Sequence, residues 1–276
     1  MPAAIRGGVP PRRKRFGQHF LHDPRVLDRI VAAIGAGAGD HLVEIGPGRG
    51  ALTERLLLPG RCTLDAIEID RDLASQLRAR FAGSPGLTLH VGDALEFDFG
   101  ALARERGGRL RVVGNLPYNI STPLLFHLLD HAAAVVDLTV MLQREVVARL
   151  AATPGSAEYG RLSVMLAPQV QVQRLFDVGP GAFQPPPRVW SALVRLTLRA
   201  QPLFSVSPLY GALVAAAFAQ RRKTLRNALS QMLTGAEISA CGLDPGARPG
   251  TLAPQAFNIL AQAAARAALD RTRGER

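Results

Sequence analysis

The chain has 276 residues, 47% of them hydrophobic, and carries a formal net charge of +11 at pH 7. This length and apolar content suffice for one large domain, or a large one with a small one, and the charge predicts a polyanionic partner. Its two cysteines, Cys62 and Cys241, indicate neither a disulfide framework nor a metal site, and no apolar stretch approaches the roughly 18 residues that span a bilayer. We therefore expect a cytoplasmic protein with no metal ion and no membrane contact, and a monomer because no heptad seam is visible.

The first predicted element is a helix that begins at "DPRVLDRIVAAI" (23–34), because Asp23 suits an N-cap and Pro24 suits the first helical position. Residues 1–11 are expected to form a disordered tail. Strand-like runs with helical stretches between them follow: strands at 41–46, 63–70, 87–93, 109–115 and 137–143, and helices at 51–58, 71–81, 121–131 and 144–151. This alternation predicts an α/β fold, with a mainly parallel, doubly wound sheet covered by helices on both faces.

From about residue 169 the pattern changes to two longer alternating segments, "VQVQRLFDV" and "RVWSALVRLTL", which predict an antiparallel addition to the sheet. The stretch "AQPLFSVSP" (200–208) is a candidate boundary between a domain at 12–204 and a small all-α domain at 205–276. Beyond it the sequence is rich in alanine, and "LYGALVAAAFAQRRKTLRNALSQML" (209–233) is its clearest predicted helix.

A glycine-rich turn follows the first predicted strand of the sheet, where "VEIGPGRGALT" places Gly46, Gly48 and Gly50 before a helix. Glycine lets the backbone turn sharply and lets a ligand approach it closely. Glu68 ends the second strand, where it can accept hydrogen bonds from ribose hydroxyls, and Asp93 ends the third, where it can hold an adenine. All three features belong to the carboxyl ends of strands, where open α/β sheets bind ligands.

This loop has three possible interpretations, two of them ligand sites and the third a turn that binds nothing. A dinucleotide is one, because Gly46, Gly48 and Ala51 satisfy G-x-G-x-x-A, although a lone match of that kind is weak. Glu44, two residues before the first glycine, disfavours a pyrophosphate and favours a cation. Nothing downstream resembles a hydride-transfer site. S-adenosylmethionine, with a ribose, an adenine and a positive sulfonium, fits better, and a tight turn without a ligand is the remaining alternative.

The fourth strand ends in "NLPY", which presents Asn115, Leu116, Pro117 and Tyr118 at the same edge of the sheet. The Asn115 side-chain oxygen and the Leu116 carbonyl can accept both N–H groups of an exocyclic amine such as adenine N6, freeing its lone pair from the ring. Proline fixes the direction of that carbonyl, and the Tyr118 ring offers a stacking face, so positioning supplies the catalysis. The base must be flipped out or unpaired to reach it. An ordinary β-turn is the plain alternative.

Motifs spread over about residues 13 to 260 resemble the small-subunit ribosomal RNA adenine dimethyltransferases: "RKRFGQHFLHD", "VEIGPGRGALT", "AIEID", "GDAL", "VVGNLPYNIST", "MLQREVVARL", "YGRLSV", "FQPPPRVWSALVRL" and "FAQRRKTLRNAL". The resemblance implies a Rossmann-like S-adenosylmethionine-dependent methyltransferase domain. It also implies dimethylation of N6 on two adjacent adenines in a hairpin loop near the 3′ end of 16S-type rRNA. The implied partner is an assembling small ribosomal subunit.

The resemblance also assigns residues. It implies cofactor contacts at His19, Leu21, Gly46, Glu68, Asp93 and Asn115, although His19 stands where the family most often has asparagine. Tyr118 and Phe183 correspond to the aromatic walls around the target adenine, with core packing as the alternative for Phe183. The basic helix "QRRKTLRNAL" is expected to hold RNA phosphates through Arg221, Arg222, Lys223 and Arg226.

Three other functions stay open at this point. A large-subunit rRNA adenine methyltransferase shares most of these motifs, although "YGRLSV" and "FAQRRKT" favour the small subunit. A non-catalytic RNA-binding assembly factor would keep the fold without the chemistry. A nicotinamide-dependent oxidoreductase would bind NAD.

Overall fold

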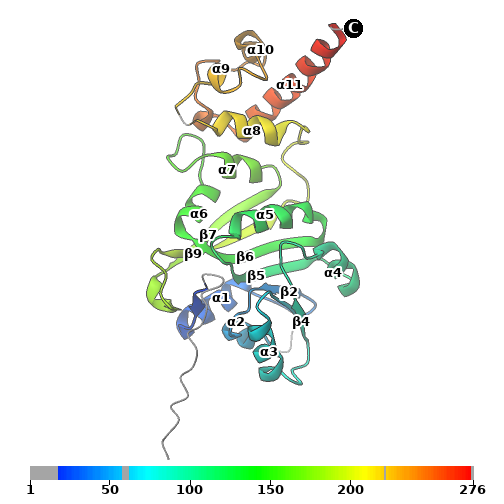
Figure 1. Ribbon diagram of the computed structural model, residues 1–276, viewed down its shortest axis with the longest axis vertical. Coiled ribbons are helices and arrows are strands. Elements are labelled where there is room, and N and C mark those ends of the chain that lie inside the picture. The colour runs from blue at the N-terminus through cyan, green and yellow to red at the C-terminus, as the bar shows by residue number, and fades with distance from the viewer. Residues whose placement is uncertain (1–17, 58–61, 221, 275–276) are drawn as a thin grey trace, which may run out of the picture.

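The computed structural model of the protein describes residues 18–57, 62–220 and 222–274 (Figure 1). Its main sheet has seven strands in the order β4-β3-β2-β5-β6-β9-β7. The strands span β2 His41–Ile45, β3 Thr63–Glu68, β4 Leu87–Val91, β5 Leu110–Asn115, β6 Val135–Gln143, β7 Val170–Val178 and β9 Ser191–Leu198. β4, β3, β2, β5 and β6 pair in parallel, whereas β9 pairs antiparallel with both β6 and β7. The predicted doubly wound sheet and its antiparallel addition are confirmed.

The helices of this part of the chain follow the predicted alternation. They span α1 Pro24–Ile34, α2 Ala51–Leu57, α3 Arg71–Arg80, α4 Phe99–Arg106, α5 Ser121–Asp130, α6 Arg144–Leu150 and α7 Arg161–Leu166, with short 3-10 turns η1 Ala132–Ala134 and η2 Pro180–Ala182. The Asp23 side chain accepts hydrogen bonds from the backbone N–H groups of Arg25 and Val26, so it caps α1 as predicted. Helices α4 and α7 were not predicted. A two-stranded ribbon, β1 (Phe20–Leu21) with β8 (Phe183–Gln184), lies outside the main sheet.

Alternate residues of the central strands pack into two separate apolar cores, one on each face of the sheet. Val112 packs with α4, α5 and α6 on one face of the sheet, and its neighbour Val113 packs with α1 and α2 on the other. Both side chains are at most 1% exposed. Since successive strand residues point to opposite faces, a continuous apolar run is what a strand buried on both sides requires.

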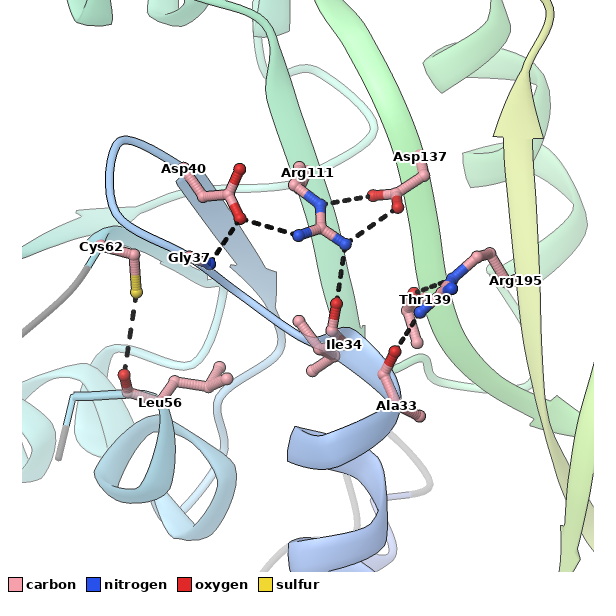
Figure 2. A network of polar contacts seen from close by, with 10 residues as sticks. All are labelled: Ala33, Ile34, Gly37, Asp40, Leu56, Cys62, Arg111, Asp137, Thr139 and Arg195. Carbon is pink, nitrogen blue, oxygen red and sulfur yellow. Dashed lines mark hydrogen bonds and ion pairs between the residues drawn. The ribbon is translucent and has the colours of Figure 1, made fainter. Parts of the chain in front are cut away.

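An arginine at the start of β5 ties the amino ends of the central strands together (Figure 2). The Arg111 guanidinium donates to Asp40 at 2.8 Å, to Asp137 at 3.0 and 3.1 Å, and to the Ile34 carbonyl at 2.7 Å. These partners come from the end of α1, the residue before β2, and β6. The network therefore holds together the amino-terminal ends of these central strands, opposite their carboxyl ends.

The C-terminal helices gather at one end of the molecule, beyond α7 (Figure 1). They span α8 Tyr210–Phe218, α9 Leu225–Ala228, α10 Gly235–Ala240 and α11 Pro254–Gly274, with a 3-10 turn η3 at Pro249–Thr251. The single helix predicted over 209–233 is wrong, because the chain leaves α8 after Phe218. The backbone N–H groups of Leu225 and Arg226 instead donate to Ala247 and Pro245. These tertiary bonds to a neighbouring loop replace the bonds that a continuous helix would have made.

The break in the helix also moves the basic residues. Arg222 and Lys223 lie in it, exposed, and Arg226 lies exposed on α9, so the "basic helix" is a basic segment over 220–226. Arg221 lies outside the described residues, as does the tail predicted at 1–11.

A second apolar cluster fills the C-terminal end. It is built from α8, α9, α10 and α11, and it also takes in Tyr159 and Val164 from the preceding region. No helix or strand lies between Leu198 and Tyr210 in this described stretch. The division into domains at 204/205 stays a prediction. None of the described helices has the length and apolar character needed to cross a membrane.

Candidate active site

A single cavity lies at the carboxyl edge of the sheet, where β2, β3, β4 and β5 end. It brings together ten of the eleven catalytic and cofactor residues that the sequence predicted, namely His19, Leu21, Gly46, Gly48, Glu68, Asp93, Asn115, Leu116, Pro117 and Tyr118. Phe183 is not among the lining residues. Strand ends far apart in sequence thus converge because the strands are parallel and in register.

Glu68, the last residue of β3, holds the glycine loop in place. Its Oε2 accepts a hydrogen bond from the Gly48 N–H and its Oε1 accepts one from the Asp70 N–H, both at 3.0 Å. Gly48 has a φ of +57°, and an added Cβ there would stand 3.0 Å from the Phe20 ring. Only glycine fits that combination of backbone conformation and close approach without displacing the ring. Burial raises the pKa of Glu68, and the two N–H bonds oppose the shift.

A second carboxylate, Glu44 on β2, lines the cavity and is 2% exposed. The Thr53 hydroxyl on α2 donates to its Oε2 at 2.6 Å. Burial raises the pKa of Glu44 to about 7, with a smaller contribution from the neighbouring charge of Glu68. Thr53 gives no signal in the sequence, because its partner lies on a different element. Two acidic groups in one buried wall suit a cationic ligand.

We predict that Glu44→Gln removes a decrease in the free energy of unfolding that the wild type shows as pH rises. The folded protein holds the Glu44 proton with a pKa of about 7, against the ordinary value of 4.5. Folding therefore weakens as pH rises from 4.5 to 7, by about 3 kcal/mol for this group, and the glutamine side chain of the variant cannot ionise. Urea unfolding at pH 5 and pH 8 measures the free energy of unfolding in each protein.

At pH 8 the free energy of unfolding of the variant should be higher than that of the wild type, and at pH 5 it should not. Glu158→Gln, at an exposed glutamate, is the matched control and should leave the difference between the two pH values unchanged. Parallel pH profiles for wild type and Glu44→Gln would contradict a buried, ionising Glu44.

Asn115, at the end of β5, is held by the segment that carries His19. Its Nδ2 donates to the His19 carbonyl at 2.9 Å. That bond fixes the orientation of the amide and leaves Oδ1 as its acceptor, to which no described residue donates. The next residues form a turn, since the Ile120 N–H donates to the Pro117 carbonyl at 3.2 Å. Asn115 and Leu116 both line the cavity, directly before this turn.

His19 holds Asn115 through its backbone and directs its side chain elsewhere. Its Nδ1 lies 2.7 Å from the Pro185 carbonyl, and its ring lies 5.9 Å from the Tyr118 ring, centroid to centroid. The contact to Asn115 is therefore independent of which side chain stands at position 19.

The Tyr118 ring is anchored at its hydroxyl end. Its hydroxyl lies 2.7 Å from the Ser191 hydroxyl at the start of β9. Burial raises the pKa of Tyr118, with the Ser191 bond opposing the shift, so the phenol stays neutral at physiological pH. A neutral, positioned ring suits stacking. Ser191 is a second residue that sequence reasoning missed.

Phe183 lies on β8, opposite Leu21 of β1 in the two-stranded ribbon. Its side chain is 2% exposed and packs with α1 and α2 rather than lining the cavity. Contact with a base would require this ring to become exposed, and its role as an aromatic wall stays a prediction. Within the residues that the structure describes, no group of three or more His, Cys, Asp or Glu side chains is arranged to hold a metal ion.

This sheet order, glycine loop and acidic strand end define a Rossmann-like S-adenosylmethionine-dependent methyltransferase. Residues 11–264 match the family described as ribosomal RNA adenine dimethylase. The protein named ribosomal RNA small subunit methyltransferase A from Pseudomonas aeruginosa is 55% identical over 90% of this chain and 93% of its own length. The protein of the same name from Methylococcus capsulatus is 56% identical, over 86% and 91%. The chain belongs to the ribosomal RNA adenine dimethylase family.

Two solved structures share the fold over nearly the whole chain. A dimethyladenosine transferase from Plasmodium falciparum is 25% identical, with a TM-score of 0.73 over 88% of this chain and 96% of its own. The 23S rRNA methyltransferase ErmE is 26% identical, with a TM-score of 0.68 over 89% and 99%.

Proposed function

We propose that the protein transfers methyl groups from S-adenosylmethionine to N6 of two adjacent adenines in the hairpin loop near the 3′ end of 16S-type rRNA, two to each adenine. The observation that carries this proposal is the cavity in which the Gly48–Glu68 pair and the Asn115–Tyr118 turn meet. The family match and the relatives at 55% and 56% identity favour it over an oxidoreductase and over a non-catalytic factor.

The cavity fits S-adenosylmethionine in the chemistry of its walls. Glu44 and Glu68 give it buried carboxylates for a cation, and the close contact at Gly48 keeps side chains out of the loop. We assign the cofactor to Gly46, Gly48, Glu68 and Asp93, together with His19, Leu21 and Asn115, which line the same cavity. When bound, S-adenosylmethionine supplies an electrophilic methyl group.

The Asn115–Tyr118 turn orients the adenine. Asn115 Oδ1 accepts one N–H of the N6 amine and the Leu116 carbonyl accepts the other, which turns the nitrogen lone pair out of conjugation with the ring. The bond from Asn115 Nδ2 to the His19 carbonyl supports this role, because it prevents the amide from presenting its donor. Tyr118, held by Ser191, stacks on the base. No strong base is required, since the nitrogen becomes acidic once it is alkylated.

The proposal is tested by incubating the protein with isotope-labelled S-adenosylmethionine and undermethylated small subunits. Nucleoside analysis should show N6,N6-dimethyladenosine, and primer extension should map it to two adjacent positions near the 3′ end. Small subunits that already carry the methyl groups are the control and should take up no label. Absence of transfer would refute the activity.

The large ribosomal subunit is the second candidate target, because ErmE shares the fold at a TM-score of 0.68. The higher identity to proteins named for the small subunit favours the small subunit. A methyl group mapped to large-subunit RNA would reverse this choice. We place the reaction in the cytoplasm, where ribosomal subunits assemble, and propose that the protein acts as a monomer.

The basic segment at 220–226 is proposed to hold RNA phosphates. Arg222, Lys223 and Arg226 are exposed, as phosphate contacts require. Replacing Arg221, Arg222 and Lys223 together by glutamine should weaken RNA binding and lower the slope of log K against log salt by about 2 to 3, since each phosphate contact contributes about 0.7 to 0.9. Filter binding of 16S-type RNA at several salt concentrations measures both effects.

The matched control removes the same charge elsewhere, by replacing the exposed Arg78, Arg104 and Arg266. It should lower affinity less and leave the slope nearer that of the wild type. Equal slopes in both triple variants would show that the basic segment only adds to the overall charge.

A further inference from the structure

Trp190 is the single tryptophan of the chain and one of its exposed large apolar residues, with 49% of its surface accessible. It lies directly before β9, in the loop that follows the proline run. Its carbonyl accepts a hydrogen bond from the Arg144 N–H at the start of α6, at 2.9 Å. The far edge of its ring lies against Gly179, where an added Cβ would be 3.6 Å away. The indole is therefore held in position while much of it faces solvent.

Two exposed arginines accompany Trp190, together with the exposed Glu145 that follows one of them and lies 4.0 Å from Arg149. The Arg144 guanidinium lies 5.7 Å from the centroid of its ring, close to the roughly 6 Å limit of a cation–π contact. Arg188, two residues earlier, is exposed, as is Arg144. The acidic neighbour on β7, Asp177, is neutralised by two hydrogen bonds of 2.6 Å from Arg174. An indole and guanidinium groups exposed side by side match the combination that binds single-stranded RNA.

Trp190 is also tied to the candidate active site. The residue after it, Ser191, has its hydroxyl 2.7 Å from the Tyr118 hydroxyl. Pro185, earlier in the same loop, has its carbonyl 2.7 Å from His19 Nδ1. One loop thus contacts Tyr118 and His19 at the cavity and carries the exposed indole beside it.

We propose that Trp190 stacks on an unpaired RNA base next to the flipped adenine, while Arg144 contacts its phosphate. An aromatic face binds any base, so this site would position the strand without reading its sequence. Holding the neighbouring nucleotide offsets part of the cost of unstacking the target base. The inference rests on the proposed function, because it requires an RNA substrate.

The first test compares Trp190→Ala and Trp190→Tyr with Leu203→Ala, at a residue that is also 49% exposed but lies in the 200–208 stretch. Methyl transfer to undermethylated small subunits should show KM raised about 5-fold or more in Trp190→Ala, the range for loss of one stacked base, with kcat little changed. Trp190→Tyr should stay within about 3-fold of the wild type, and Leu203→Ala should match it. Thermal melting confirms that each variant is folded.

The second measurement uses the indole as its own probe, because no other tryptophan contributes to the emission. A synthetic RNA hairpin with two adjacent adenines in its loop should quench the fluorescence of the full chain as it binds. Dye anisotropy on the same hairpin reports binding independently of the indole.

The inference is overturned by an unchanged KM in Trp190→Ala, by equal losses in the alanine and tyrosine variants, or by RNA binding that leaves the emission unchanged. Each of these results leaves methyl transfer by the wild type in place. Absence of transfer by the wild type would instead refute the proposed function. The two failures are therefore distinguishable.

Discussion

Replacing Asn115 by alanine is expected to reduce kcat for methyl transfer by about 100- to 1000-fold, the range for losing one preorganised group that acts on the reacting atoms. The variant loses the Oδ1 acceptor, so the adenine amine keeps its lone pair in the ring. Cofactor affinity should fall only modestly, because Gly48 and Glu68 keep their hydrogen bond. Single-turnover transfer to undermethylated small subunits, with calorimetric binding of S-adenosylmethionine, separates the two effects.

Asn115→Asp is the informative partner variant. A carboxylate keeps an acceptor for the amine but cannot donate to the His19 carbonyl, so we expect activity between those of the wild type and Asn115→Ala. Methylation at the wild-type rate by Asn115→Ala would refute the two-acceptor arrangement. A loss of cofactor binding as large as the loss of turnover would mean that Asn115 acts through the cofactor alone and not on the adenine.

The carboxyl edge of the sheet was predictable because its residues follow strands that the apolar pattern marks clearly. Glu68 and Asn115 are the last residues of β3 and β5, and parallel pairing brings those ends together. The same reasoning could not find the partners that orient them. Thr53 and Ser191 are ordinary residues in the sequence, and each matters only through a bond to a side chain on another element.

The wrong prediction of one helix over 209–233 has the same origin. The helix predicted over 209–233 has the composition of a helix, yet Leu225 and Arg226 bond to residues about twenty positions later. Local propensity is a weak guide where tertiary bonds compete with it. The burial of Phe183 could not be predicted either, because the β1–β8 ribbon in which it lies is too short to show a pattern, and its role at the target base stays a prediction.

The polar network around Arg111 joins the central strands at the ends opposite the cavity. Arg111 and Asp137 have side chains only 14% and 11% exposed, and they lie at the amino ends of β5 and β6. The cavity at the other ends needs unpaired acceptors such as Asn115 Oδ1. The charges of this network are paired with one another, so the strands are fixed at the end that no ligand needs to enter.

Arg111→Met is therefore expected to destabilise the fold by about 3 to 5 kcal/mol, because it leaves buried Asp137 without its cation. The matched control is Arg174→Met, which removes a shorter ion pair, 2.6 Å to Asp177, from a surface where Arg174 is 45% exposed, and it should cost less than about 1 kcal/mol. Urea unfolding measures both.

Adding Asp137→Leu to Arg111→Met should restore part of the loss, since no unpaired carboxylate then remains on β6. Equal costs for the two arginines would mean that burial does not set the strength of these pairs, and a loss of kcat in the folded Arg111 variant would mean that the two edges of the sheet are coupled.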